Sequence, residues 1–186
     1  MPDTDPVVPV FPAGYGPVPN DFNTWVQGPF TFLAAKVMLR AELQAAQALT
    51  ANASTLVQFG STGGDILEDP YGGWSTTATG SQPAWSWLCP AGCTGWYEFT
   101  MTAFTANPGS STDAVQAILY VDGAEYAVTS CIWGDNGHAT GGCGAVTVPL
   151  IGGVDYAQMF IYSTVGVNTT ATAGQYPTPE ACWVST

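Results

Sequence analysis

From about residue 55 to its end, the chain is a series of short segments in which apolar and polar residues alternate, separated by Gly, Pro, Ser and Thr. In the clearest segment, 96–104, Tyr97, Phe99 and Met101 fall on one face, and Trp96 and Glu98 on the other. A period of two is that of a half-buried β-strand. The sequence predicts strands at 55–59, 85–88, 96–104, 114–121, 124–128, 145–150, 156–164 and 182–186.

One tight turn stands out between these segments. Asp122-Gly123 separates 114–121 from 124–128, and this dipeptide between apolar runs is a strong hairpin signal. Several short strands joined by Gly- and Pro-containing turns are typical of an antiparallel sandwich or jelly roll. We therefore predict a mainly β fold, an antiparallel jelly-roll sandwich, over residues 53–186.

Two of the predicted strands, 114–121 and 156–162, are apolar on both faces. A strand of an antiparallel sandwich normally has one face in water, so a second surface is expected to cover the other. We predict an interface between identical subunits, with Tyr156, Phe160 and Tyr162 among its contacts.

The first 28 residues are predicted to form an extended arm. Residues 1–29 hold seven of the 14 prolines, which exclude a helix or a central strand over most of this stretch. A short helical turn, capped by Asn20 or Asp21, is expected before Gly28. The arm is unusually apolar for a flexible linker, so we expect it to dock on another protein; the alternative is a disordered tail. The docking candidates are Val10, Phe11, Tyr15, Phe22 and Trp25.

A helix is predicted over 29–52. Pro29 suits a first helical position, and the run that follows is rich in helix formers without Gly or Pro. Such a helix is too apolar to stand alone in water, so it packs on the domain or bundles with copies of itself. Its candidate contacts in an oligomer are Phe30, Leu33 and Val37.

The charge balance excludes several classes of function. The 186 residues include 2 basic and 14 acidic ones, a formal net charge of −12. Binding of nucleic-acid phosphates or of an anionic membrane surface needs Lys and Arg. The best apolar run, 30–49, is broken by charged and amide side chains, so no membrane insertion is expected, nor is a secretory signal. A chain with only 9% charged residues has a surface poor in charge, which favours a protein that packs against copies of itself or other proteins.

Five cysteines leave three alternatives open. Cys89 and Cys93 bracket one short loop, Cys131 and Cys143 bracket a Gly-rich one, and Cys182 is left over. Two local disulfides are one interpretation, buried reduced thiols another, and a zinc site with the single histidine the third, although the spacing matches no paired zinc pattern. We favour at least one disulfide.

No catalytic motif occurs in the chain. Sequences typical of a nucleophile elbow, a zinc protease or a phosphate-binding loop are absent, so neither an enzyme nor a cofactor is predicted. The acidic cluster 65–69 is expected to be a solvated turn rather than a calcium loop. The loop with Trp133, Asp135 and His138 is the candidate surface-binding site, where Trp133 is able to stack on a sugar.

The predicted sandwich resembles the trimeric jelly roll of the tumour-necrosis-factor and complement globular-domain superfamily. The resemblance lies in 72–74 (GGW), in 89–104 with Pro90, Gly95, Tyr97 and Phe99, in the hairpin 118–126, and in 148–164. The turn Gly153-Val154-Asp155 departs by one residue from the Gly-Asp of that family. The resemblance implies a homotrimer.

Residues 20–42 (NDFNTWVQGPFTFLAAKVMLRAE) resemble the anchoring segment of small virion proteins of tailed bacteriophages of actinobacteria. This implies a non-enzymatic virion structural protein, a minor tail protein or head fibre, assembled in the host cytoplasm and displayed on the virion surface. Its partners would be other virion proteins and a host-envelope glycan. The alternatives are a capsid decoration protein without a receptor role and a carbohydrate-binding module.

Overall fold

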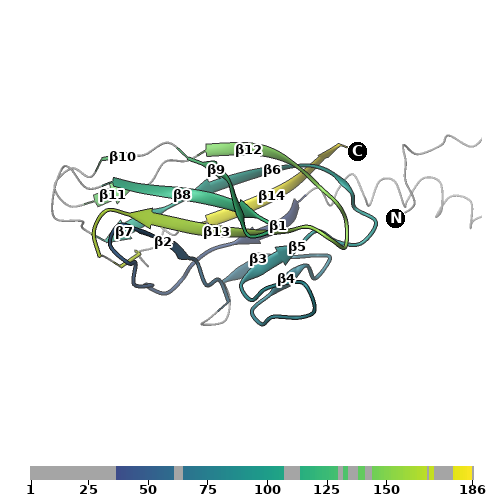
Figure 1. Ribbon diagram of the computed structural model, residues 1–186, viewed down its shortest axis with the longest axis horizontal. Coiled ribbons are helices and arrows are strands. Elements are labelled where there is room, and N and C mark those ends of the chain that lie inside the picture. The colour runs from purple at the N-terminus through teal and green to yellow at the C-terminus, as the bar shows by residue number, and fades with distance from the viewer. Residues whose placement is uncertain are drawn as a thin grey trace, which may run out of the picture.

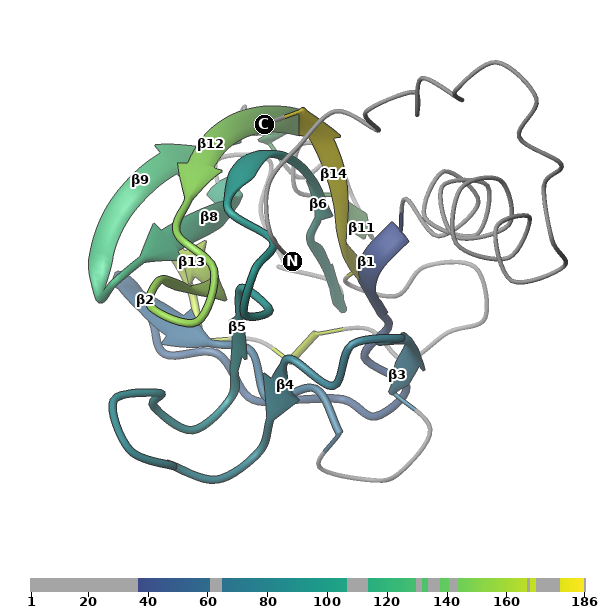
Figure 2. The ribbon, with the colours of Figure 1, turned by 90° about the vertical axis from the view of Figure 1, so that its right-hand side faces the viewer.

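A computed structural model describes residues 37–60, 65–106, 114–129, 132–133, 138–140, 144–166, 168–169 and 178–185. Two antiparallel sheets enclose a common interior (Figures 1 and 2). The first sheet has the order β12-β6-β14-β1-β3, and its strands are β1 (Val37–Ala41), β3 (Ile66–Glu68), β6 (Gly95–Thr102), β12 (Gly144–Leu150) and β14 (Thr178–Ser185).

The second sheet has the order β10-β8-β13-β5-β4, and β9 also pairs with β8. Its strands are β4 (Trp74–Ser75), β5 (Ser86–Leu88), β8 (Ala114–Val121), β9 (Ala124–Val128), β10 (Ile132–Trp133) and β13 (Tyr156–Ser163). The strand β2 (Ala53–Leu56) lies near β13, and β7 (Phe104–Ala106) pairs with β11 (His138–Thr140).

The chain passes repeatedly from one sheet to the other. It runs from β5 to β6, back to the hairpin β8–β9, then to β12, β13 and β14, which lie alternately in the first and second sheets. This is the connectivity of a jelly roll. The predicted antiparallel sandwich is therefore confirmed.

The core follows from the alternation read in β6. Tyr97, Phe99 and Met101 are buried between the sheets. Trp87 of β5 is fully buried and meets the rings of Tyr97 and Phe99 edge-on, at centroid distances of 5.6 and 6.1 Å. Edge-to-face pairs of this kind add roughly 0.5–1.5 kcal/mol beyond the burial of their area. The central strands are thus held by aromatic packing across the sandwich.

The hairpin prediction at Asp122-Gly123 is confirmed. Both residues have positive φ, 51° and 77°, which matches the two-residue turn whose twist suits paired strands. The turn sets the register of β8 and β9, in which Ile118 lies opposite Val128.

The predicted helix over 29–52 is wrong for residues 37–52. Residues 37–41 form β1, which pairs with β14 on one side and β3 on the other. Leu39 and Leu43, read as part of an apolar helix, are buried in the sandwich core. Burying such a side chain contributes roughly 1.5–3 kcal/mol, whereas helix propensities differ by only tenths of a kcal/mol per residue. The sandwich therefore extends at least sixteen residues before position 53, from 37 to 52; residues 29–36 lie outside the described residues.

Candidate interaction surfaces

The outer face of the second sheet carries rows of apolar and aromatic side chains across three strands. In one row, Val128 lies opposite Ile118, which lies opposite Phe160. In the next, Glu125 lies opposite Tyr120, which lies opposite Gln158, and Gln116 faces Tyr162 in a third. We call this surface the aromatic face. It consists of Gln116, Ile118, Tyr120, Glu125, Val128, Gln158, Phe160 and Tyr162.

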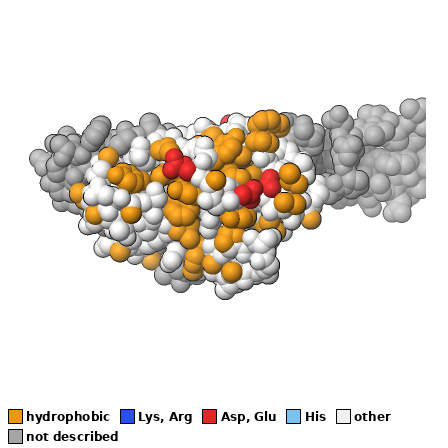
Figure 3. All heavy atoms as spheres, viewed as in Figure 1, with side chains coloured by type: hydrophobic (Ala, Val, Ile, Leu, Met, Phe, Trp, Pro, Cys, Tyr) orange, Lys and Arg blue, Asp and Glu red, His pale blue; other side chains and the backbone are white. Residues whose placement is uncertain are grey.

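Two rings form the centre of the aromatic face. The centroids of Tyr120 and Phe160 lie 4.2 Å apart with ring planes tilted by 37°. Both side chains are half-buried, whereas Val128 beside them is 44% exposed. In Figure 3, hydrophobic side chains gather over β8 and β13, with acidic ones among them. Ile118 and Gln158 of the aromatic face are buried, so its accessible part consists of Val128, Glu125 and the partly covered rings.

The predicted oligomer contacts on β13 share this side of the sheet. Ala157, Met159 and Ile161 are buried in the core, so the alternation turns Tyr156, Phe160 and Tyr162 to the outer side. The backbone N–H of Tyr156 donates to Asp122 Oδ1 at 3.0 Å, which ties β13 to the hairpin turn. Of the remaining predicted contacts, Phe30 and Leu33 lie outside the described residues, as does the side chain of Val37.

The charges on this side of the molecule are acidic. Glu125, opposite Tyr120, is exposed, and so is Asp122 at the turn. The described residues of the aromatic face include no Lys or Arg. Arg40 lies on β1 in the other sheet, with its guanidinium 3.9 Å from the Glu68 carboxylate. Exposed pairs of this kind contribute roughly 0–1 kcal/mol.

A second exposed apolar group gathers at the end of the sandwich where the chain enters β1. Trp96 and Val184 are 45% and 52% exposed, and the turn after β12 adds Ile151 and Val154 at 55% and 57%. Trp96 lies opposite both the exposed Pro149 and Ser185. We call Trp96, Pro149, Ile151, Val154 and Val184 the apolar end. The alternation along 96–104 puts Trp96 on the face away from Tyr97, so a signal for its exposure is present in the sequence.

Val37 connects the apolar end to the preceding part of the chain. It lies opposite Cys182, two residues before Val184. Because β1 runs antiparallel to β14, β1 begins at the end of the first sheet where Val184 and Ser185 lie. The predicted docking residues Val10, Phe11, Tyr15, Phe22 and Trp25 all precede it and lie outside the described residues.

Cys89 and Cys93 are free thiols, so the disulfide predicted between them is wrong in this structure. Both are buried, and the Cys89 Sγ lies 3.3 Å from the Tyr97 hydroxyl and 3.3 Å from the Cys93 carbonyl oxygen. The Tyr97 hydroxyl also donates to that carbonyl. Burial raises the pKa of the Cys89 thiol to about 11. The thiol is packed as a small apolar group with its polar contacts satisfied.

Cys182 differs because it is only half-buried and lies on the outer face of the first sheet. Burial, the hydrogen bond to the Glu180 carboxylate and the nearby charges of Glu180, Glu98 and Glu68 raise its pKa to about 11. A thiol with a raised pKa is a poor nucleophile at neutral pH. Cys131 and Cys143 lie outside the described residues, so their predicted disulfide stays a prediction.

The predicted surface-binding loop is described only in part. Trp133 belongs to β10, opposite Ala114, and His138 belongs to β11, opposite Ala106, but their side chains and all of Asp135 lie outside the described residues. Where the structure describes the chain, no three His, Cys, Asp or Glu side chains gather as metal ligands.

The acidic cluster 65–69 is not the solvated turn that we expected. Asp65 is fully buried, and its carboxylate accepts hydrogen bonds from the backbone N–H groups of Gln44 and Gly60 at 3.2 and 3.0 Å. Asp69 accepts from the N–H groups of Gly73 and Trp74. A buried carboxylate needs such donors. The cluster therefore ties loops to the sandwich.

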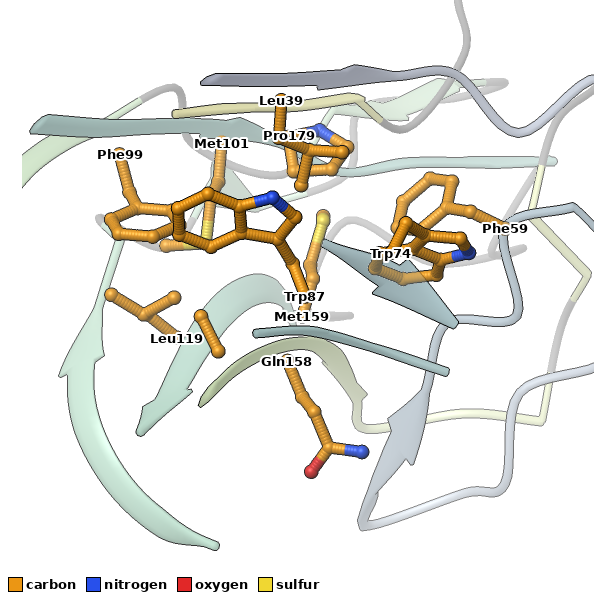
Figure 4. Close-up of a pocket in the computed structure, with 11 residues that line it drawn as sticks. Leu39, Phe59, Trp74, Trp87, Phe99, Met101, Leu119, Gln158, Met159 and Pro179 are labelled. Carbon is orange, nitrogen blue, oxygen red and sulfur yellow. The ribbon is translucent and has the colours of Figure 1, made fainter. Parts of the chain in front are cut away.

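Among the described residues, the space between the two sheets is nearly filled by side chains. A cavity of about 10 Å³ between the sheets is lined by aromatic and aliphatic side chains, with Trp87 across its middle (Figure 4). That volume is at the lower limit for a single water molecule. The indole N–H groups of Trp74 and Trp87 have no partner among the described residues. In that same part of the chain, no helix is long and apolar enough to cross a membrane.

Comparisons with known proteins bear on the fold. No family model matches the sequence, and no curated protein matches it either. Among solved structures, the chain is similar to vertex protein P5 of PRD1, with a TM-score of 0.51 and 16% identity over 80% of this chain and 99% of that one. It is also similar to the tumour necrosis factor Eiger of S. frugiperda (TM-score 0.46, 10% identity, 82% and 96% covered) and to a family 35 carbohydrate-binding module from an environmental isolate (0.35, 15%, 79% and 98%). The chain shares the fold of the PRD1 protein along almost all of that protein's length.

Proposed function

We propose that this protein is a non-enzymatic structural protein of a bacteriophage particle, a minor tail protein or head fibre displayed on the virion surface. The observation that carries the proposal is the jelly roll of residues 37–185, which is similar to the PRD1 vertex protein over 99% of that chain. The composition supports it, because a surface poor in charge suits close packing against other proteins.

The proposed assembly is a homotrimer held together at the apolar end. The apolar side chains there are 45–57% exposed; they are Trp96, Ile151, Val154 and Val184. Phe160 and Tyr162 of the aromatic face are less exposed. Clusters of exposed apolar side chains are typical of protein–protein contacts. Association at this end would also bring the starts of the three β1 strands near one another, because Val37 lies opposite Cys182.

The proposed role of residues 1–28 is to anchor the trimer to another virion protein. We expect deletion of residues 1–28 to leave the number of subunits in the assembly unchanged and to abolish its incorporation into particles, because the described sandwich starts at β1. Incorporation is measured by detecting the protein in purified particles, with the full chain as control. Unchanged incorporation of the shortened chain would refute the anchoring role.

Two alternatives from the sequence predict different outcomes. A decoration protein without a receptor role would bind particles, but its removal would leave adsorption to the host unchanged. A carbohydrate-binding module would retain a glycan and lose it when Trp133 is replaced by alanine. The position of the protein in a particle image, on shell, tail tube or tip, separates tail protein from decoration protein.

A further inference from the structure

We propose that the aromatic face binds a segment of another protein in which Lys or Arg side chains stand next to apolar ones. This goes beyond the proposed function, because it concerns the chemistry of a partner and not the place of the protein in a particle. The surface concerned is built on β8, β9 and β13, away from the apolar end's Trp96 and Val184.

The partner needs apolar side chains because one row of the aromatic face is apolar across all three strands. Val128 is 44% exposed, Ile118 beside it is 3% exposed, and Phe160 completes the row. A side chain laid on Val128 and Phe160 would remove from water an apolar strip that the chain's own residues leave partly open. Burial of this strip contributes affinity in proportion to its area.

The partner also needs a positive charge, because the next row of the aromatic face places a carboxylate opposite an aromatic ring. Tyr120 stacks on Phe160 at 4.2 Å and has the exposed carboxylate of Glu125 as its cross-strand partner. Directly opposed side chains on a sheet lie within contact distance. A guanidinium or ammonium group placed there meets an aromatic ring and a carboxylate together, and both attract it. A partner without a cation would leave the Glu125 carboxylate to be covered without compensation.

A second copy of this chain is a poor occupant of the same face. A second copy would bring a chain with a formal net charge of −12 against the exposed Glu125 carboxylate, and like charges at an interface are unfavourable. The chain's cations are Lys36 and Arg40, and Arg40 lies on the other sheet beside Glu68. A neutral glycan is also disfavoured, because the Gln158 side-chain amide in the middle of the face already donates to the Ala84 carbonyl oxygen at 3.1 Å.

The test uses the full chain and a fluorescein-labelled peptide of repeated Arg-Leu-Gly, with binding followed by fluorescence anisotropy. The same peptide with citrulline in place of arginine keeps the shape and removes the charge. We expect the arginine peptide to bind and Glu125→Gln to weaken it by roughly three- to tenfold. Tyr120→Leu, which keeps an apolar side chain but removes the ring, should weaken it to a similar extent.

The matched control is Glu98→Gln. Glu98 is equally an exposed glutamate on a strand, but it lies on the outer face of the first sheet, so its replacement changes the net charge by the same amount. We expect less than about a twofold effect from Glu98→Gln. Urea unfolding of each variant verifies that the sandwich remains folded.

Three results would overturn the inference. Equal weakening by Glu125→Gln and Glu98→Gln would mean that only net charge matters, and equal binding of the citrulline peptide would mean that no cation is recognised. Loss of the native oligomer mass in Glu125→Gln, with unchanged peptide binding, would assign the face to a second copy. Each of these leaves the proposed place in the virion untouched.

Discussion

Gly73 is required by the close approach of β5. A Cβ added there would lie 2.5 Å from the Leu88 carbonyl oxygen and 2.6 Å from the Trp87 Nε1. Neither neighbour is free to move, since Leu88 N donates to the Gly73 carbonyl and Trp87 is at the centre of the core. The residue at 73 therefore sets how closely the strand pair β4–β5 packs.

Gly73→Ala should lower the free energy of unfolding by roughly 1–3 kcal/mol, because an extra methyl group in a packed interior forces backbone shifts. Urea denaturation measures the change. Gly166→Ala is the control, since its added Cβ would meet nothing nearer than 3.7 Å. Equal stability of the two variants would contradict the packing argument.

The Cys89 thiol makes stability depend on alkaline pH. Its pKa is raised from 9.0 to about 11 in the fold, first of all by burial. Above pH 9 the unfolded chain loses this proton and the folded chain keeps it, so the folded state binds more protons there. The stabilisation is fully present below pH 9 and is lost as the pH rises toward 11.

We therefore expect the free energy of unfolding to fall by roughly 2 kcal/mol between pH 8.5 and pH 11 on account of this thiol. Urea unfolding at several pH values measures the slope. Cys89→Ala should flatten it, whatever its effect on stability at neutral pH. A slope that is the same in both proteins would show that the thiol is not buried.

At the scale of elements, β1 is the most consequential difference from the sequence prediction. Its residues lie between β14 and β3, with Val37 opposite Cys182 and Arg40 opposite Glu68. Removing residues 37–52 would expose the edges of two strands and take Leu39 and Leu43 out of the core. The segment 37–52 is thus part of the sandwich and not a stalk in front of it.

A chain that begins at residue 37 should unfold cooperatively, and a chain that begins at residue 53 should not fold. The loss of several buried leucines, at roughly 2–5 kcal/mol each, exceeds the stability of an ordinary domain. Thermal unfolding followed by circular dichroism distinguishes the two chains. If the chain that begins at residue 53 folds, the domain boundary predicted from the sequence at residue 53 is correct.

The strands that the sequence predicted are those whose pattern is local. β6, β8, β9 and β13 show either strict alternation or an apolar run bounded by turn residues. β3 and β4 are only three and two residues long and exist because a neighbouring strand is there to pair with. β3 pairs with β1, which was not predicted as a strand, and β4 pairs with the short strand β5.

At the scale of the whole molecule, two accessible surfaces divide the proposed tasks. The apolar end lies beside the start of β1, and its turn residue Asp155 accepts a hydrogen bond from the Ile151 N–H through Oδ2 at 2.8 Å. The aromatic face combines rings with an exposed carboxylate. Self-association suits the first surface and a cationic partner suits the second.

Val184→Glu should shift the oligomer toward monomer, because it places a charge in the proposed contact. Val128→Glu is the matched control, since it is the same substitution at a similarly exposed valine, 44% against 52%, on the aromatic face. Mass measurement in solution distinguishes oligomer from monomer. If Val128→Glu dissociates the oligomer and Val184→Glu does not, the subunits contact one another through the aromatic face and not through the apolar end.

The sequence by itself determined the alternating strands, the Asp122-Gly123 hairpin, the buried face of β6 and the acidic, charge-poor surface, because each depends on neighbours within a few residues or on composition. Only the tertiary structure decided that 37–41 is a strand, that Asp65 is buried, that Cys89 and Cys93 are free, and which apolar side chains remain exposed. These depend on pairing between distant segments, as between Val37 and Cys182. Burial against a distant strand outweighs local propensity, and no local pattern records it.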